Sequence, residues 1–165
     1  MNHYIHSFCF LLLFLVNSCT NDSIKNSNQP SEEATKQQLN KLLDNWHQAA
    51  ADAEFETYFD LMAENSIFIG TDASENWSKT EFITFSKPFF DAGKAWAFKA
   101  TERAIYFNDR KDVAWFDELL DTWMGTCRGS GVIENENGAW KIKHYVLSVT
   151  IPNELMDEFI SLQKD

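Results

Sequence analysis

The C-terminal half of the chain consists of three long runs of strand-forming residues. They cover residues 95–107, 113–133 and 139–151, and the turn sequences NDRKD and ENENG separate them. The middle run has 21 residues, whereas an ordinary strand has roughly 5 or 6, so we expect it to curl. A bend or bulge costs least at its glycines, which are Gly125, Gly129 and Gly131. The sequence therefore predicts long, strongly curved antiparallel strands.

Three helices are predicted before these strands. Apolar residues at three-and-four spacing run from Leu39 to Ala53 and from Phe55 to Met62. A short strand at 66–70 follows, and Ser78 with Glu81 forms a capping box that begins a third helix. Pro88 is expected to bend this helix and Gly93 to end it.

Together these elements predict an α+β fold in which three N-terminal helices pack on a strongly curved antiparallel sheet, with a short C-terminal helix. The shape is a cone. Such a shape tends to leave a pocket between the concave face of the sheet and the helices.

Five short motifs accompany this order of elements: FIGTDASENW at 68–77, WFDELL at 115–120, CRGSGV at 127–132, WKI at 140–142 and IPNE at 151–154. On these motifs, residues 37 to about 155 resemble the nuclear transport factor 2-like superfamily, and in particular its SnoaL-like branch. That superfamily contains polyketide cyclases, ketosteroid isomerases, dehydratases and many proteins with no activity. The resemblance therefore implies the fold and a cavity, but no particular reaction.

Three carboxylates, Asp117, Glu118 and Asp121, lie among apolar residues in the stretch VAWFDELLD. A buried carboxylate must be solvated, paired or neutral, because burying it ionised and alone costs several kcal/mol or more. Closing the hairpin over NDRKD places Arg103 opposite Asp117, and a one-residue change in loop length places it opposite Glu118. An ion pair is therefore the favoured interpretation and a catalytic acid the alternative. Aromatic residues on both faces leave open which acid points inward.

Other polar residues could contact a ligand. Arg128 lies between small residues that let an anionic group approach, although pairing with an acid is commoner. His144 shares a predicted face with Trp140 and Ile142, so it is either a general base or a buried, hydrogen-bonded histidine. Asp72, Glu75 and Trp77 fall in a loop at a position that rims the cone's opening in similar folds, although a solvated loop is the favoured interpretation.

These considerations define a candidate ligand pocket: Asp72, Glu75, Trp77, Trp96, Arg103, Trp115, Asp117, Glu118, Arg128 and His144. Its possible catalytic residues are Asp117, Glu118 and His144. Cys127 is expected to be a small buried residue rather than a nucleophile. His47 follows Trp46 on a helix and is expected to face solvent.

Composition argues against several classes of partner. A net charge of -11 disfavours nucleic acid, because there is no excess of Lys and Arg to neutralise phosphates. After residue 18 the histidines are His47 and His144, far apart in sequence, so neither a metal site nor a cofactor is expected. Neither a glycine-rich phosphate loop nor a G-x-S-x-G elbow occurs.

The N-terminus resembles a bacterial lipoprotein signal. The apolar run FCFLLLFLV at 8–16 is too short to span a bilayer and ends shortly before Cys19. We therefore predict a signal peptide at 1–18, lipidation of Cys19, a flexible tether at 19–35 and the SnoaL-like domain at 36–165. This places the domain in the bacterial cell envelope, periplasmic or surface-exposed, with the Cys19 lipid as its only membrane contact. The alternative is a plain secretory peptide cut nearby.

Three functions remain possible. The favoured one is binding of a small, largely apolar ligand in an aromatic-lined cavity. The second is a cofactor-independent isomerase, cyclase or dehydratase of the SnoaL type, in which an acid or His144 moves a proton. The third is a dimeric interaction module with a vestigial pocket. A homodimer is expected in any case, because a sheet with large side chains on both faces needs a cover on the face that the helices leave bare.

Overall fold

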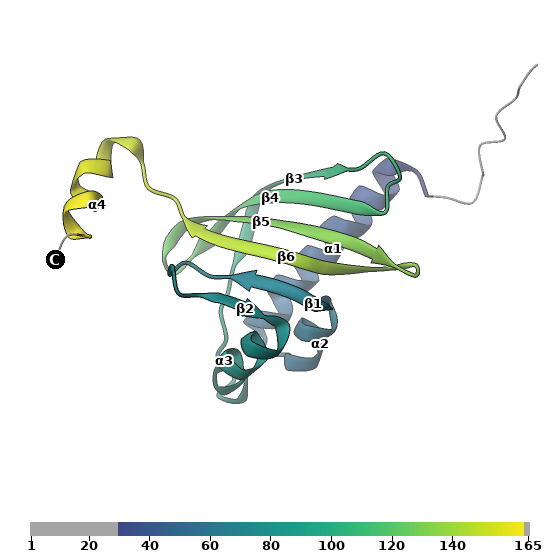
Figure 1. The fold of residues 1–165 in the computed structure, drawn as a ribbon, viewed down its shortest axis with the longest axis horizontal. Coiled ribbons are helices and arrows are strands. Elements are labelled where there is room, and N and C mark those ends of the chain that lie inside the picture. The colour runs from purple at the N-terminus through teal and green to yellow at the C-terminus, as the bar shows by residue number, and fades with distance from the viewer. Residues whose placement is uncertain (1–29, 164–165) are drawn as a thin grey trace, which may run out of the picture.

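A computed structural model describes residues 30–163 of the chain. Helices and strands follow one another in this order (Figure 1): α1 (Glu32–Ala51), α2 (Phe55–Asp60), β1 (Met62–Ile69), β2 (Asn76–Ser78), α3 (Lys79–Asp91), β3 (Lys99–Phe107), β4 (Val113–Thr122), β5 (Gly125–Glu136), β6 (Ala139–Val149), a 3-10 turn η1 (Asn153–Leu155) and α4 (Met156–Leu162). None of the described helices is long and apolar enough to cross a membrane.

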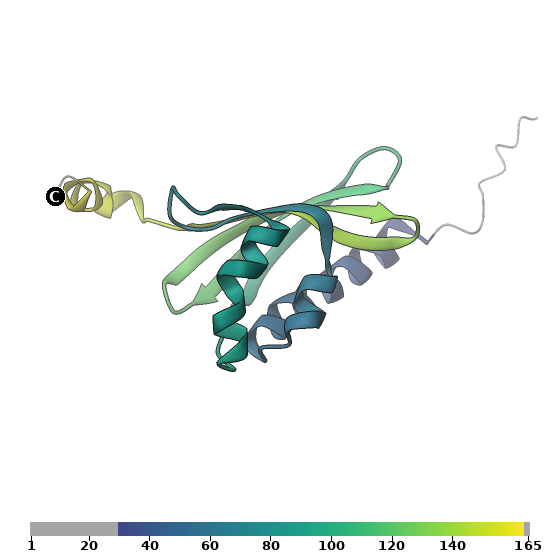
Figure 2. The ribbon, with the colours of Figure 1, turned by 60° about the horizontal axis from the view of Figure 1, so that its bottom comes forward.

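The six strands form one curled sheet in the order β2-β1-β6-β5-β4-β3. Its pairs are antiparallel except for β1 and β6, which run parallel. The helices α1, α2 and α3 all lie on one side of the sheet, and its other side carries no helix (Figure 2). The predicted α+β cone is confirmed, with one parallel pair in a sheet expected to be antiparallel throughout.

The predicted 21-residue strand is instead a hairpin of β4 and β5. The chain reverses at Trp123 and Met124, where the Thr122 hydroxyl accepts from the backbone of Met124 at 3.0 Å and donates to the Gly125 carbonyl at 2.9 Å. Gly125 then takes a φ of +86°, which favours glycine. The prediction of a single curled strand was therefore wrong: the glycine marks a turn.

Capping residues set the helix starts. The Ser31 hydroxyl accepts from the backbone of Ala34, so α1 begins at Glu32, inside the segment predicted as a tether. Ser78 and Glu81 cap α3 reciprocally, as the sequence predicts. The loop before it also contributes the short strand β2, which the sequence did not reveal, and β1 begins at Met62 instead of residue 66.

Aromatic rings fill the interior of the cone. Trp46 stacks on Tyr58 with ring centroids 4.9 Å apart, and Phe68 stacks on Phe82 at 4.0 Å. Tyr145 of β6 meets the Trp46 ring edge-on at 4.8 Å. Burying so many rings stabilises the fold through apolar area and ring geometry together. On the side of the sheet that the helices cover, the hollows consequently lie at the mouth and the flank of the cone.

Candidate functional site

Glu118 is the acid that points into the cone. On β4 the residues 116, 118 and 120 are buried, and Glu118 is only 1% exposed. The strand register places Arg103 opposite Glu118, which is the second of the two pairings that the loop length left open. Gly129 of β5 makes room, because a Cβ there would collide with the hydroxyl of Tyr145 and approach the Glu118 carboxylate.

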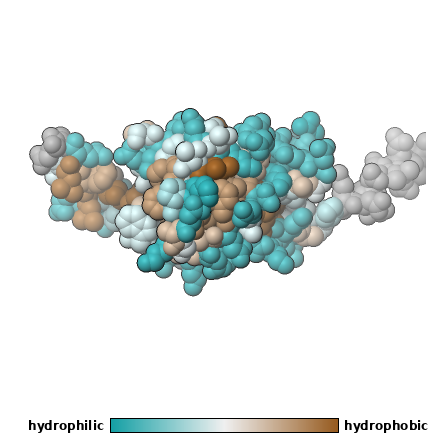
Figure 3. All heavy atoms as spheres, turned by 90° about the horizontal axis from the view of Figure 1, so that it is seen from below, coloured by the Kyte–Doolittle hydropathy of each residue, from teal (hydrophilic) through white to brown (hydrophobic). Residues whose placement is uncertain are grey.

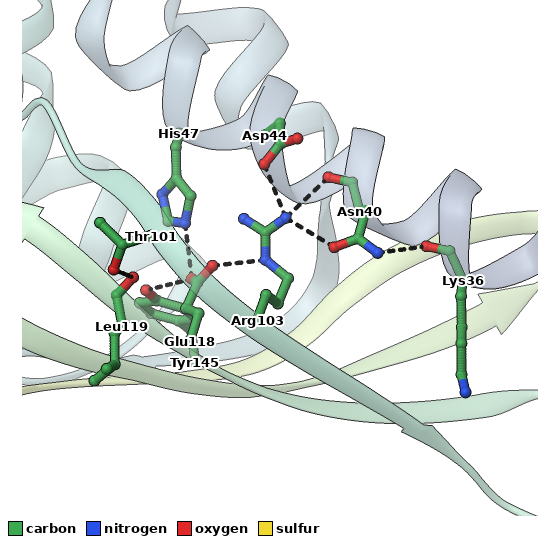
Figure 4. Close-up of polar contacts among 9 residues, drawn as sticks. All are labelled: Lys36, Asn40, Asp44, His47, Thr101, Arg103, Glu118, Leu119 and Tyr145. Carbon is green, nitrogen blue, oxygen red and sulfur yellow. Dashed lines mark hydrogen bonds and ion pairs between the residues drawn. The ribbon is translucent and has the colours of Figure 1, made fainter.

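Three buried side chains satisfy the Glu118 carboxylate (Figure 4). Arg103 donates from Nε to Oε2 at 2.8 Å. His47 Nε2 and the Tyr145 hydroxyl both lie against Oε1, at 2.8 and 3.0 Å. His47 is thus buried in α1, and the expectation that it faces solvent was wrong, because its helix turns it toward the acid on β4.

Arg103 ties the sheet to α1. Its Nη1 donates to the carboxylate of Asp44 at 2.8 Å and to the backbone carbonyl of Asn40 at 3.1 Å (Figure 4). With Glu118 on the other side, the guanidinium connects β3 and β4 to two turns of the helix. The cluster of Glu118, His47, Arg103 and Tyr145 is called the polar centre below.

The charges in the polar centre decide the protonation state of Glu118. Burial alone would raise the pKa of this carboxyl, and it is the largest single influence. The hydrogen bonds and charges of His47 and Arg103 together outweigh it, so the pKa falls below its ordinary value of 4.5. Burial and the neighbouring Glu118 charge raise the pKa of Tyr145 well above its ordinary range. At neutral pH Glu118 is therefore ionised and Tyr145 keeps its proton.

An ionised carboxylate can only accept, so Nε2 of His47 carries a hydrogen. When the ring is neutral, its Nδ1 then holds a lone pair. His47 also lines a hollow of about 700 Å³ between the C-terminal half of α1 and the ends of β3 and β4. The other walls come from Asp44, Gln48, Ala51, Ala97, Phe98, Lys99, Ala100, Asp121 and Thr122.

A second hollow, about 150 Å³, opens at the mouth of the cone. Most of its lining is aromatic or apolar: Phe68, Gly70, Thr71, Glu75, Trp77, Phe82, Phe85, Trp96, Phe98, Trp123, Met124 and Leu147. Trp77 stacks on Phe85 with centroids 4.4 Å apart, and Trp123 on the β4–β5 turn is 82% exposed. We call this hollow the aromatic pocket.

The aromatic pocket contains three of the predicted pocket residues, Glu75, Trp77 and Trp96. The Glu75 carboxylate lies over Gly70, where any Cβ would collide with it. Asp72 stays outside the lining, and its carboxylate accepts instead from the backbone and hydroxyl of Ser74. Of the 72–77 loop, Glu75 and Trp77 therefore line the aromatic pocket and Asp72 does not.

Four predicted residues lie on the opposite, helix-free face of the sheet. Trp115, Val132 and His144 occupy paired positions across β4, β5 and β6 and line a groove of about 360 Å³. Asp117 forms an ion pair with Arg128 at 2.9 Å, and both side chains are roughly half exposed. We call this the outer face.

His144 was expected to share the inner face with Trp140 and Ile142. The register between β5 and β6 shifts after Val132, and two residues instead of one separate the inward-facing Ile142 from Tyr145. This irregularity turns His144 to the outer face, so the expectation was wrong.

The three candidate catalytic residues consequently do not form one site. Glu118 belongs to the polar centre, whereas Asp117 and His144 lie on the outer face. His47 and Asp44, and the rings of Phe82 and Phe85 that line the aromatic pocket, were not predicted as site residues from the sequence. A signal was available for His47: it lies four residues after Leu43 and three before Ala50, on the buried face of α1. Nothing in the sequence indicated that α1 would cross over Glu118.

Within residues 30–163 no three His, Cys, Asp or Glu side chains gather closely enough to hold a metal ion. Cys127 is wholly buried on β5, in the position expected of a small core residue.

Residues 39–152 match the model of the SnoaL-like domain. The chain belongs to this family. Its fold is similar to that of solved nuclear transport factor 2-like proteins. A protein of unknown function from Pseudomonas putida KT2440 is 14% identical, with a TM-score of 0.61 over 74% of this chain and 91% of its own.

Two further structures share the fold at similar distance. A proposed dehydratase from Streptomyces avermitilis is 13% identical, with a TM-score of 0.62 over 73% of this chain and 99% of its own. The association domain of C. elegans CaMKII is 20% identical, with a TM-score of 0.60 over 73% of this chain and all of its own. No curated protein matches the chain. At these identities the likeness concerns the SnoaL-like fold alone.

Proposed function

We propose that this SnoaL-like domain binds a small, largely apolar ligand that carries one ring, in the aromatic pocket. The observation that supports this most directly is the lining of stacked rings around a hollow of about 150 Å³ that opens at the mouth of the cone. An apolar cavity of about this volume can hold a benzene-sized molecule. Buried structural cores close over their rings, whereas this wall leaves Trp123 and Phe85 uncovered.

The rim suggests how such a ligand is oriented. Trp77, Phe82 and Phe85 offer parallel ring faces on one side, with interplanar angles near 20°. The Glu75 carboxylate and Thr71 supply acceptors at the edge. An apolar ring with one hydroxyl or amine donor fits both features, since specificity in such pockets comes from a few placed polar groups.

The test is binding of phenol and toluene, followed by tryptophan fluorescence and by saturation-transfer NMR. Trp123→Ala and Phe85→Ala should each weaken binding about tenfold, or roughly 1.4 kcal/mol. Glu75→Gln should weaken phenol and spare toluene. Trp115→Ala, on the outer face, is the matched control and should leave the affinities for phenol and toluene within twofold. Absence of saturable binding, or an equal loss in Trp115→Ala, would contradict the proposal.

A second candidate function is cofactor-independent proton transfer, and His47 is the observation that favours it. Its Nε2 is fixed by Glu118 at 2.8 Å, and its ring lines the hollow of about 700 Å³. An ionised carboxylate behind an imidazole stabilises the imidazolium that forms when Nδ1 accepts a proton. The likeness to a proposed dehydratase from Streptomyces avermitilis is compatible with such chemistry.

A generic substrate for proton abstraction tests this candidate without knowledge of the true one. The protein should accelerate the ring opening of 5-nitrobenzisoxazole above the rate with free imidazole, and His47→Ala should abolish the gain. His144→Ala is the control, because that histidine lies on the outer face. Equal rates for the native protein, His47→Ala and His144→Ala would contradict proton transfer by His47.

We further propose that the domain forms a homodimer through its outer face. Tyr106 and Trp115 lie there with stacked rings, each nearly half exposed. The groove beside Trp115 is mostly apolar, and ion pairs such as Asp117–Arg128 and Lys143–Glu134 surround it. An apolar centre with a charged rim on a helix-free face is typical of an interaction surface. The likeness to an association domain of CaMKII supports self-association in this fold.

We also propose that Cys19 carries a lipid that anchors the domain in the bacterial cell envelope, periplasmic or exposed at the surface. Cys19 and the predicted signal peptide lie outside the described residues, so this proposal is supported by the sequence motif only. Cys19→Ala should move the protein from the membrane to the soluble fraction. A variant that still sediments with membranes would contradict lipidation at this residue.

A further inference from the structure

The C-terminal arm, residues 153–162, carries an apolar surface that nothing in the described chain covers. It comprises η1 and α4, and it projects beyond the end of β6, clear of the body in two views (Figures 1 and 2). No residue of either element is buried. Five large apolar side chains, between 36% and 75% exposed, are grouped on it (Figure 3): Leu155, Met156, Phe159, Ile160 and Leu162.

Such an arm requires a partner surface. A helix of seven residues is far below the roughly 12 to 15 that an isolated helix needs in water, so packing must hold α4 together. The outer face offers a second uncovered apolar surface within residues 30–163, the groove between its ion pairs. Its groove of about 360 Å³ is lined by Trp115, Val132, Val146 and their neighbours, and Trp115 is 46% exposed.

The path of the chain directs the arm away from its own outer face. Thr150 donates from its backbone and from its hydroxyl to the carbonyl of Thr126, at 3.1 and 2.7 Å. These bonds keep the residues after β6 in line with the sheet. To reach its own groove the arm would have to reverse within residues 150–152.

The area that a stable dimer buries also favours a contribution from the arm. Without the three-residue β2, the five longer strands of the sheet lie about 4.8 Å apart and are about 30 Å long, which gives an outer face of roughly 600 Å². A standard interface buries about 800 Å² on each partner, so the face alone falls short. Covering the arm's five apolar side chains adds roughly 50 to 100 Å² each, which closes the gap.

We propose that two copies exchange their C-terminal arms, so that the apolar side of η1 and α4 from one copy docks in the Trp115–Val146 groove of the other. A twofold axis makes the exchange reciprocal, so both arms and both grooves are covered at once. The inference rests on the proposed pairing through the outer face and adds the arm as its second element.

Sedimentation equilibrium of the full chain tests the arm, in a background where Cys9 and Cys19 are serine. The background protein should be a dimer at micromolar concentration, and Phe159→Ser with Ile160→Ser should raise the dimer Kd at least tenfold. Phe89→Ser removes a similarly exposed ring from α3, away from both surfaces, and should stay within twofold. If the arm variant matches the background while Trp115→Ser dissociates, pairing stands and arm exchange fails. A monomeric background protein overturns both.

Disulfide trapping distinguishes exchange between copies from folding back. A Phe159→Cys copy mixed with a Val146→Cys copy should give a covalent dimer under mild oxidation, and Cys127 is buried and takes no part. Closure within a single chain that carries both cysteines, with no covalent dimer in the mixture, would show that the arm covers its own face and would overturn the proposal.

Discussion

The polar centre and the aromatic pocket lie on the same concave side of the sheet. They differ in how far their side chains are satisfied by partners within the protein. Every oxygen of the Glu118 carboxylate has a buried partner, supplied by β3, β6 and α1. The aromatic pocket has stacked rings on its walls but leaves Trp123 and Phe85 open to water. Arg103 Nη2 is the one buried nitrogen of the polar centre without a hydrogen-bond partner. A carboxylate with every oxygen paired stabilises the fold, whereas an incomplete apolar surface is available for a ligand. Substitutions should separate the two regions by what they change, stability or binding.

The largest effect is expected at Glu118. Glu118→Gln leaves Arg103 and His47 without their buried charge partner, and breaking a buried pair in this way costs about 3 to 5 kcal/mol. Asp117→Asn is the matched control, one residue along the strand, because it breaks a half-exposed pair with Arg128 worth at most about 1 kcal/mol. Urea unfolding measures both free energies.

A double-mutant cycle with Arg103→Met sharpens this prediction. If Glu118 and Arg103 act as a unit, the losses from Glu118→Gln and Arg103→Met should be strongly non-additive, and Asp117→Asn should add to either. Comparable costs at Glu118 and Asp117 would show that the polar centre does not hold the fold together.

A smaller loss is expected at Gly129, behind the polar centre. A Cβ there would push on the Tyr145 hydroxyl and the Glu118 carboxylate, so Gly129→Ala should cost about 1 to 3 kcal/mol through overpacking. Ligand binding in the aromatic pocket, measured on the folded variant, should remain within twofold. Loss of phenol affinity without loss of stability would mean that the two regions are coupled.

The helices and the cone could be predicted from the sequence because their signals are local. The capping box at Ser78 and Glu81 begins α3 as predicted, and apolar spacing locates α1 and α2. The β4–β5 turn was missed because Gly125 suits a bend and a turn equally well. The choice depended on the hydroxyl of Thr122, whose role appears only in three dimensions.

The candidate site was predicted less well, for a physical reason. Alternation along β4 could separate Asp117 from Glu118 but could not say which face the helices cover. The shift in register on β6, which sends His144 outward, leaves no mark in the residue pattern. His47 joins Glu118 across 71 positions of sequence, and only the crossing of α1 over the sheet brings them together.

Acid should weaken the polar centre through Glu118. The folded-state pKa of Glu118 lies below its ordinary 4.5, so its charge stabilises the fold fully above that value. This contribution is lost as the pH falls below about 4.5 and through the lower folded value. The free energy of unfolding should therefore decline more steeply with acid in the native protein than in Glu118→Gln. Parallel curves would assign the acid sensitivity to other carboxylates.

The smallest effect on stability is expected from Trp123→Ala, at the opposite end of the comparison. This ring is 82% exposed on a turn that the Thr122 hydroxyl already holds, so its removal should change the free energy of unfolding by no more than about 0.5 kcal/mol. The same substitution is expected to weaken phenol binding about tenfold. If removing the Trp123 ring leaves stability unchanged but weakens binding, the ring serves the ligand site and not the fold. If Trp123→Ala instead destabilises the protein by more than about 1 kcal/mol, its ring is part of the core in solution, and the mouth of the cone is closed rather than open.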